Sequence, residues 1–390
     1  MTRLSAETIR SETAVRRGAD IALSLDVREA SDREFALNEW RSLEAQQNAV
    51  PLTCSADWTE AWIDAYGDLV SHWFVLAKEA TSGRTAGVCL VTRGVGQKDG
   101  PLPVRSLHLG TAGEPEADSV CVEYNDVLVE PNAHPEFCRL LGLYFKEHRG
   151  IDQWNIDGAD EQLVAEFDAE AEPPLTRRTE VAHWFDLTVP RGNGTRVLDE
   201  LRSSTRRKVK RSLEAYGELS VDWSQSLNEA TDIFGDLVDL HQARWNAVGK
   251  PGSYASERFI RFHEALLVRL VPEQRMFFVR VRSGVETVGC VQLFNDRNRA
   301  LLYQCGWAPA EGKRSPGVVV DYLAMEECLS RGFDAYDFLA YETQHKRHLS
   351  NRCSNLIWAY RRRPRLRFSL LNAARNLKHH LKTRNSGQQP

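Results

Sequence analysis

The hexapeptide 312–317, Gly-Lys-Arg-Ser-Pro-Gly, combines two cations with the signals of a helix start. Ser315 is typical of an N-cap, and Pro316 is favoured at the first helical position. The first amides of a helix point outward where the helix dipole is positive, so the segment has the composition of a phosphate-binding site. Spacing alone leaves a second interpretation equally open, an ordinary capped helix with a solvated Lys313-Arg314 pair.

Lysine and arginine also gather at two other places. Residues 202–211 hold six of them with no acid, and twelve more follow Glu342, where no acidic residue occurs up to Pro390. On a helix the first group covers more than one face, so it is either a solvated surface or a contact for a polyanion such as CoA, tRNA or a nucleotide-linked sugar. In the tail, five apolar residues recur at helical spacing: Leu366, Leu370, Ala374, Leu377 and Leu381. This tail would lie on an anionic membrane, pack its stripe on the protein, or bind RNA.

The charge is divided unevenly along the 390 residues. Residues 1–185 contain 17 Lys+Arg and 32 Asp+Glu (−15), and residues 186–390 contain 33 and 22 (+11), which sum to the net −4. We therefore expect an anionic partner for the second half. Eight scattered cysteines without a C-x-x-C pair predict neither disulfides nor a metal site. The polar N-terminus and the absence of an apolar run of ~18 residues predict a cytoplasmic protein.

The elements that must position these residues follow the same order twice. Each half gives a predicted strand, one or more helices, an antiparallel run of strands, a helix and a buried strand, which is an α+β arrangement. The expected division is a leader (1–20), a first domain (21–180), a second domain (181–363) and a basic tail (364–390), with an acidic, Pro-containing connection at 158–180. Two expectations matter below: a continuous helix over 194–216 and a strand over 121–129.

The passage 301–346 resembles a known family. Its strand, its loop, its Ser-Pro-Gly helix, the turn at Gly332 and the following Asp-Phe-Leu are similar to the C-terminal half of the CelD-like acetyltransferases of the GNAT superfamily. These are relatives of the Fem-type ligases, which move amino acids from aminoacyl-tRNA to cell-wall precursors. The resemblance extends to the basic segment 201–211 and to His-Gln-Ala-Arg-Trp at 241–245, and is faint in the first half.

The resemblance implies two tandem GNAT-like domains, each a mixed, mostly antiparallel sheet flanked by helices. The second would hold the donor, acetyl-CoA or another acyl-CoA, and the acceptor would lie between the two. The residues implied to bind the donor are Lys313, Arg314, Ser315, Gly317, Val318, Arg206 and Arg207. The family's loop is Gln/Arg-x-x-Gly-x-Gly/Ala, and this chain departs from it. Since Pro316 lacks an amide proton, the two cations would carry more of the phosphate contact.

Family members end in Asp-Phe-Leu-x-Gly-x-Glu-x-Tyr-Lys. Here residues 337–346 keep the Asp and the Lys, carry Glu342 one position before the family's Glu, and replace the Gly and the Tyr with Tyr341 and His345. The resemblance makes Lys346 the first choice for electrostatic stabilisation. Asp337 would take part in catalysis as well or, the interpretation we favour, would be a structural residue that forms an ion pair at the end of its strand. Either Glu342 or His345 would be the base. Two first-half carboxylates, Glu123 and Asp126, are weaker candidates.

The predicted function is therefore an N-acyltransferase that moves an acyl group from acyl-CoA to an amine of a cell-envelope or exopolysaccharide precursor. One alternative is a Fem-like transferase that uses aminoacyl-tRNA. Another is a non-catalytic accessory protein of polysaccharide synthesis, held at the inner membrane face by the tail. We expect a small-molecule or glycan acceptor and no DNA binding.

Overall fold

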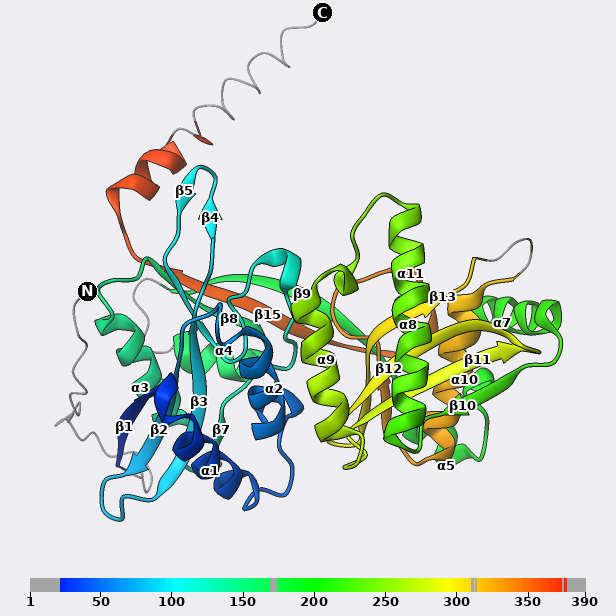
Figure 1. The fold of residues 1–390 in the computed structure, drawn as a ribbon, viewed down its shortest axis with the longest axis horizontal. Coiled ribbons are helices and arrows are strands. Elements are labelled where there is room, and N and C mark those ends of the chain that lie inside the picture. Colours follow the sequence, from blue (N-terminus) through cyan, green and yellow to red (C-terminus); the bar gives the residue numbers. More distant parts are fainter. Residues whose placement is uncertain (1–21, 169–173, 310–311, 313, 374, 377–390) are drawn as a thin grey trace, which may run out of the picture.

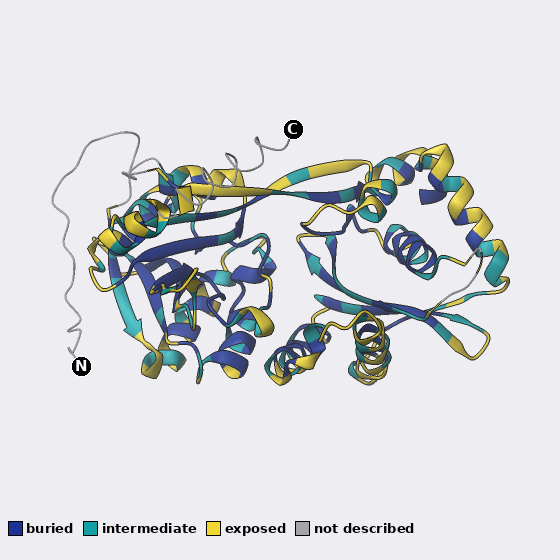
Figure 2. Ribbon diagram, turned by 90° about the horizontal axis from the view of Figure 1, so that it is seen from above, coloured by how far each residue is buried: buried dark blue, intermediate teal, exposed yellow. Residues whose placement is uncertain are grey.

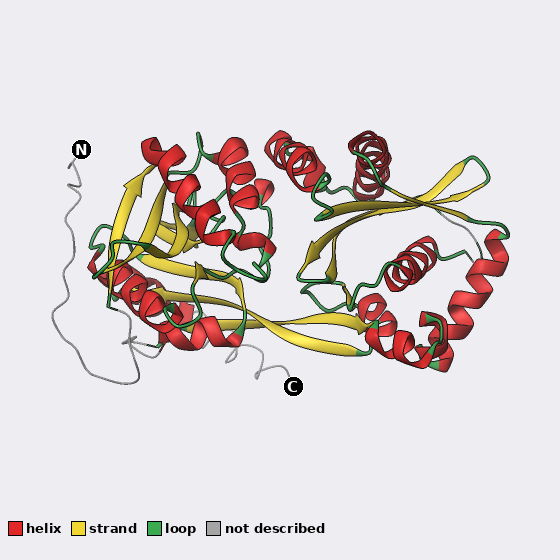
Figure 3. Ribbon diagram, turned by 90° about the horizontal axis from the view of Figure 1, so that it is seen from below, coloured by secondary structure: helices red, strands yellow, loops and turns green. Residues whose placement is uncertain are grey.

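The computed structural model describes residues 22–168, 174–309, 312, 314–373 and 375–376. Two lobes lie side by side, and a pair of long strands, β9 and β15, runs from one to the other (Figures 1 and 3). The leader, Lys313 and most of the predicted tail stripe lie outside the described residues. None of the described helices has the length and apolar character that a bilayer crossing requires.

The first lobe is built from the first half of the chain. Its elements are β1 (Leu23–Glu29), α1 (Arg33–Glu44), α2 (Ala56–Tyr66), β2 (His72–Glu79), β3 (Thr85–Arg93), the hairpin β4 (Lys98–Asp99) and β5 (Leu102–Pro103), β6 (Ser106–Leu109), β7 (Leu128–Val129), α3 (His134–Glu147), β8 (Gln153–Ala159), α4 (Glu161–Asp168) and β9 (Thr176–Asp186).

The second lobe follows three connecting helices, α5 (Thr188–Asn193), α6 (Val197–Glu200) and α7 (Ser203–Tyr216). Its elements are β10 (Ser220–Trp223), α8 (Leu227–Ala247), α9 (Glu257–Leu270), β11 (Met276–Ser283), β12 (Glu286–Asp296), β13 (Arg299–Trp307), α10 (Pro316–Ser330), β14 (Ala335–Asp337), α11 (Gln344–Leu349) and β15 (Arg352–Arg362). Leaving β4, β5 and β7 aside, the order strand, two helices, three strands, helix, strand, helix, strand occurs in both lobes, which confirms the predicted α+β tandem fold.

The last strands of the two repeats are exchanged. Strand order in the large sheet is β1-β2-β3-β6-β8-β15-β9-β14-β13-β12-β11-β10. Thus β15, from the second repeat, pairs with β8 of the first, and β9 pairs with β14 of the second. The two exchanged strands also pair with each other along their length. The proposed boundary between residues 180 and 181 therefore falls inside β9.

Three large clusters of buried apolar side chains hold this sheet between its helices, as the buried inner faces in Figure 2 show. One lies between α3, α4 and the first lobe's strands, and one between α10, α7 and the second lobe's strands. The third is shared by both lobes, because α2 packs on α9. There the rings of Trp58 and Phe262 meet edge to face with centroids 5.0 Å apart.

Two predicted elements differ for local reasons. The helix expected over 194–216 is interrupted, because Leu201 adopts an extended backbone between α6 and α7 and buries its side chain in the second lobe's core. The strand expected over 121–129 is mostly loop, because Cys121 and Tyr124 have positive φ angles of 47° and 56°. An L-residue in that region cannot continue an extended strand. The expected connection 158–180 contains α4 and the start of β9.

Candidate functional site

The neighbouring strands β13 and β14 part early in the second lobe. They pair in parallel only between Arg299–Leu301 and Ala335–Asp337. Beyond this point β13 continues to Trp307, paired on its other edge with β12, and a bulge leaves Tyr303 without an opposite partner. Within the described chain no strand covers the remaining edge of β13. We call this unpaired edge, together with the start of α10, the opening; Gly317 of α10 and His345 both lie against Trp307 at its end.

Lys346 lies at this opening because the short helix α11 carries it there. Thr343 caps α11, its hydroxyl accepting the Lys346 backbone amide at 3.2 Å. The Lys346 ammonium donates to the carbonyl oxygens of Ala340 at 2.5 Å and Leu339 at 3.3 Å. Burial lowers the pKa of Lys346, and neighbouring groups that include Cys305 of β13 act against that effect. The ammonium therefore sits between β13 and the segment that follows β14.

Glu123 brings a carboxylate from the first lobe to the same place. Its side chain is only 9% exposed, and Oε2 accepts the amide of Ala340 at 2.6 Å. Burial raises the pKa of Glu123 to about 7, against the opposite influence of the Lys346 ammonium. A carboxylate that changes protonation near neutral pH, close to a half-buried ammonium, is suited to proton transfer.

Asp337 takes part in a buried network that ties the lobes together. Its Oδ2 accepts the Tyr124 hydroxyl at 2.6 Å and pairs with the Arg299 guanidinium, while Oδ1 accepts the Leu339 amide at 2.8 Å. Leu339 itself has a positive φ of 62°. Asp337 therefore fixes the turn whose carbonyl holds Lys346, and its contacts are those of a positioning residue.

His345 forms a dyad with a carboxylate that the sequence analysis missed. Its Nε2 is 2.5 Å from Oδ2 of Asp321, a buried residue of α10. The other Asp321 oxygen is 3.2 Å from the hydroxyl of Tyr336. The His345 ring centroid lies 6.5 Å from that of Trp307, at the end of β13. A lone acid in the apolar run Val-Val-Val-Asp-Tyr was the signal for this residue.

Two other predicted carboxylates have different surroundings. The side chain of Glu342 is about half exposed and pairs with Arg347 at 3.3 Å and, more weakly, with His183 at 3.8 Å. Asp126 lies on the first lobe, where Oδ1 is 3.4 Å from Nε2 of His134. The structure thus brings Lys346 together with Glu123, and places neither Glu342 nor Asp126 against its ammonium.

The predicted phosphate loop is anchored on α7. The Ser315 amide donates to the buried Ser212 hydroxyl at 2.8 Å, and Arg314 lies over the Tyr216 ring at 5.1 Å. The helix begins at Pro316 as expected, although the Ser315 side chain makes no capping hydrogen bond. The buried Gly317 lies against the Trp307 ring, since a Cβ there would come within 3.3 Å of it. Val318, the next residue, is buried too.

The two predicted arginines of α7 have separate environments. Arg206 donates to the carbonyl oxygens of Asp199 and Leu201, so it stabilises the non-helical turn between α6 and α7. Arg207 is exposed. The start of α7 lies near α11, because Lys208 is among the cations that, together with burial, lower the pKa of His348. A further cation that the sequence analysis assigned no role, Arg244 of α8, stacks over Trp307 at 4.1 Å.

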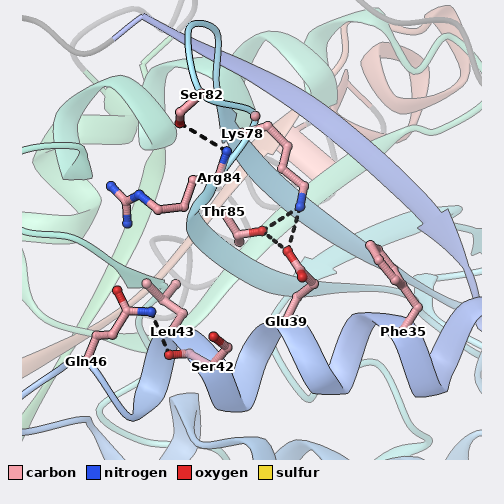
Figure 4. A pocket seen from close by; sticks show the side chains of 10 residues that line it. Phe35, Glu39, Ser42, Leu43, Gln46, Lys78, Ser82, Arg84 and Thr85 are labelled. Carbon is pink, nitrogen blue, oxygen red and sulfur yellow. Dashed lines mark hydrogen bonds and ion pairs between the residues drawn. The ribbon is translucent and has the colours of Figure 1, made fainter.

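A cavity of about 310 Å³ lies elsewhere, between α1 and the β2–β3 hairpin (Figure 4). The Lys78 ammonium in it is 2.6 Å from both Glu39 and Thr85. Its main charges are therefore already paired, and we assign it no part in chemistry.

Comparison with known proteins agrees with this fold. Residues 200–347 match the family described as Acetyltransferase (GNAT) domain. The C-terminal domain of a putative lysylphosphatidylglycerol synthetase from Agrobacterium fabrum superposes with a TM-score of 0.53 at 11% identity, covering 88% of this chain and 96% of that one. FemX superposes with a TM-score of 0.54 at 10% identity, covering 83% and 95%. No curated protein sequence matches the chain.

Proposed function

Residues 200–347 form a GNAT-type acyltransferase domain, and from this premise we propose an N-acyltransferase whose second lobe binds the acyl donor and whose first lobe supplies the base. The observation that carries the proposal is that Glu123 and Lys346 both bind the backbone of Ala340, one its amide and the other its carbonyl, near the unpaired edge of β13. The Lys346 ammonium, the Glu123 carboxylate and the unpaired edge of β13 then lie close together between the lobes.

In the proposed reaction the donor's acyl carbon lies beside Lys346. The acceptor amine forms a bond to this carbon, its proton passes to the Glu123 carboxylate, and the C–S bond of the thioester breaks to release CoA thiolate. The Lys346 ammonium stabilises the oxyanion of the tetrahedral intermediate, an effect that is strong where water is excluded. Glu123 is buried and Lys346 is half-buried, so the two groups are partly shielded from water.

The donor phosphates would lie at the start of α10, near Arg314, Lys313 and the amides of Gly317 and Val318. Arg244 on Trp307 adds a cation on the α8 side of the same opening. An acyl-CoA, with acetyl-CoA the first choice, matches these cations in chemistry. For the acceptor we propose an amine of a cell-envelope or exopolysaccharide precursor, following the resemblance to CelD-like enzymes.

A Fem-like donor, aminoacyl-tRNA, is the second candidate. One observation favours it: exposed cations of α7, among them Arg207 and Lys208, continue the basic surface past the loop, toward α11. CoA is too short to use many of them, whereas a tRNA backbone would release more counterions. The binding constant for tRNA should then fall steeply with salt.

Isothermal titration with acetyl-CoA, a longer acyl-CoA and an aminoacyl-tRNA at two salt concentrations separates the candidates. Heat with a CoA ester that depends little on salt supports the first candidate, and heat only with aminoacyl-tRNA supports the second. Absence of heat with every donor contradicts both and leaves the accessory role. The matched variant Lys208→Ala, which changes an exposed cation of α7, should weaken tRNA binding and leave CoA binding unchanged.

We also propose that the basic tail contacts an anionic membrane at the cytoplasmic face. Residues 366–373 are helical, and Leu366 and Leu370 are 84% and 70% exposed while Phe368 between them is 3% exposed. The buried ring anchors the helix to the first lobe, and Arg367 pairs with the buried Asp152. The two leucines, one turn apart, are left facing outward with basic residues around them.

A further inference from the structure

A cluster of three different ligand types lies on the first lobe, outside the proposed acyl-transfer site. His134 and Cys138 are four residues apart on α3, so their side chains lie on one face of that helix. Glu166 reaches the same point from α4. The His134 Nδ1 is 2.6 Å from Glu166 Oε2 and 3.8 Å from Cys138 Sγ, and the three ligand atoms lie within 4.8 Å of one another.

We propose that His134 Nδ1, Cys138 Sγ and Glu166 Oε2 bind a divalent transition metal ion, with Zn²⁺ as the best match. Zinc takes imidazole nitrogen, thiolate sulfur and carboxylate oxygen together, whereas Mg²⁺ and Ca²⁺ prefer oxygen ligands alone. Cys138 is completely buried and the other two side chains are about one fifth exposed. The sulfur is thus protected while one side of the cluster remains open.

The environment of the second imidazole nitrogen supports this assignment independently. His134 Nε2 faces Oδ1 of Asp126 at 3.4 Å. A histidine that binds a metal through one nitrogen usually donates the proton of the other to a carboxylate, which fixes the ring's orientation. Asp126 holds that outer position here, on the side of the ring away from Cys138 and Glu166.

A cavity of about 310 Å³ borders the cluster at His134, on the Asp126 side of the imidazole. It is lined by His134, Asp126 and Asp160 of the first lobe and by Arg297 of the second. Three protein ligands leave one position of a tetrahedral ion free for a water, and the partial exposure of His134 and Glu166 gives the ion access from solvent. The sequence analysis expected no metal because it searched for paired cysteines; a His-x-x-x-Cys spacing on one helix is a weaker signal.

Metal uptake has a defined proton balance. Both imidazole nitrogens of His134 face carboxylates, so Nδ1 donates its proton to Glu166 in the metal-free protein. Binding of Zn²⁺ replaces this proton and the thiol proton of Cys138 with metal bonds, and both are released to the buffer. The Nε2 proton stays on its hydrogen bond to Asp126.

The test uses the full chain with the exposed Cys121 and Cys353 changed to Ser, so that surface thiols do not contribute. After chelator treatment the protein is titrated with Co²⁺ and with Zn²⁺. We expect one equivalent of Co²⁺ with a thiolate-to-cobalt charge-transfer band in the near ultraviolet, and its displacement by Zn²⁺. Cys138→Ser should abolish the band, whereas Cys328→Ser, which changes another buried thiol, should retain it.

Two further variants keep the test decisive if Cys138→Ser does not fold. Glu166→Gln should remove the rise in melting temperature that Zn²⁺ produces, because a ligand that binds only the folded state stabilises it. Asp126→Asn should weaken the affinity about 10- to 100-fold. Failure of the folded parent to bind one equivalent, or an unchanged Co²⁺ spectrum in Cys138→Ser, overturns the proposal. Donor titration is unaffected by either outcome, so the two proposals fail separately.

Discussion

The two lobes have the same order of elements, but the corresponding pair of parallel strands is hydrogen-bonded to a different extent in each. In the first lobe β6 pairs with β8 along its whole length, from Ser106 to Leu109, and an isolated bridge between Asn125 and Ala159 extends the ladder. In the second lobe β13 and β14 pair over three residues, and β13 then continues to Trp307 without β14. The fold is thus closed in one copy and open in the other.

The loop after β6 closes the first copy. The side chain of Asn125 donates to the Leu109 carbonyl at 2.9 Å, and its backbone amide bonds Gly158. The same loop carries an acidic segment at 113–119, where the second lobe has its cationic one. Under the proposed function, the loop's polar side chains, more than the strand order, would decide which copy accepts a donor. The charge difference between the halves agrees with this, because the half with the acidic segment is net negative and the half with the cationic segment is net positive.

Removal of Lys346 should have the largest effect on this comparison. We expect Lys346→Ala to lower kcat/KM by about 100- to 1,000-fold, the usual loss when one group that stabilises an oxyanion is removed. The measurement is CoA release with whichever donor binds, against a panel of amines. Lys98→Ala, an exposed lysine of the first lobe's β4–β5 hairpin, is the control and should be unchanged. Equal activity of both variants would contradict the role of Lys346.

Glu123→Gln should have the next largest effect, with Glu114→Gln as its matched control. Both glutamates are buried in the first lobe, and burial raises the pKa of each to about 7. Glu123 accepts a proton only when ionised, so the wild-type rate should rise with pH through about 7. Glu123→Gln should remove that rise and lower kcat about 100-fold. Glu114→Gln, away from Lys346, should leave the pH–rate profile unchanged.

The same pair predicts how stability depends on pH. In the unfolded chain these carboxyls lose their protons near their ordinary value of 4.5, whereas in the folded protein they keep them to about 7. Between these values the folded state binds more protons, so the free energy of unfolding should fall as pH rises, by about 1.4 kcal/mol per pH unit and group. Denaturant titrations at several pH values should show the slope reduced in both glutamine variants. An unchanged slope in both would contradict the raised pKa values.

Much of the fold could be read from the sequence, because it depends on local periodicity. The strand at His72–Glu79 and the helix beginning at Pro316 agree closely with the structure. The exchange of β9 and β15 could not, since both repeats offer equivalent edges and only tertiary packing chooses between them. The sequence likewise placed Lys346 in the site, but α11, the six-residue helix that carries it, was too short to show a pattern.

The base could be predicted only in part. Glu342 and His345 were the two candidates because they are near Lys346 in sequence, whereas the structure brings Glu123 to the same turn from 223 positions earlier in the chain (346 − 123). Local spacing carries no information on a contact across two lobes. The positive φ of Tyr124, which turns the loop toward Asp337, was equally hidden, since tyrosine rarely adopts it.

Neutralising the phosphate loop should have a moderate effect. The double variant Lys313→Ala, Arg314→Ala removes two cations just before α10. We expect donor affinity to fall about 10- to 100-fold, less than the loss of two full charged hydrogen bonds, because Arg314 is exposed and water screens its interaction with a phosphate. In the first lobe Glu116→Lys changes an exposed residue of the corresponding loop. It should not create a donor site, because β6 and β8 remain paired. Calorimetry that shows unchanged affinity in the double variant would rule out the loop assignment.

Changes in the tail should have the smallest effect. The tail follows β15, the last strand of the second repeat, and lies against the first lobe. Leu366→Ser with Leu370→Ser removes two exposed apolar side chains without disturbing Phe368 or the pair between Arg367 and Asp152. Binding to anionic vesicles, measured by co-sedimentation, should fall several-fold, because the two apolar side chains that would enter the interface are lost while the basic residues remain. Val285→Ser, at a fully exposed hairpin of the second lobe, should change nothing. If the Leu366/Leu370 double variant binds vesicles as well as the wild type, the tail helix has no role at the membrane. Its basic residues then serve to pair with the acidic first lobe.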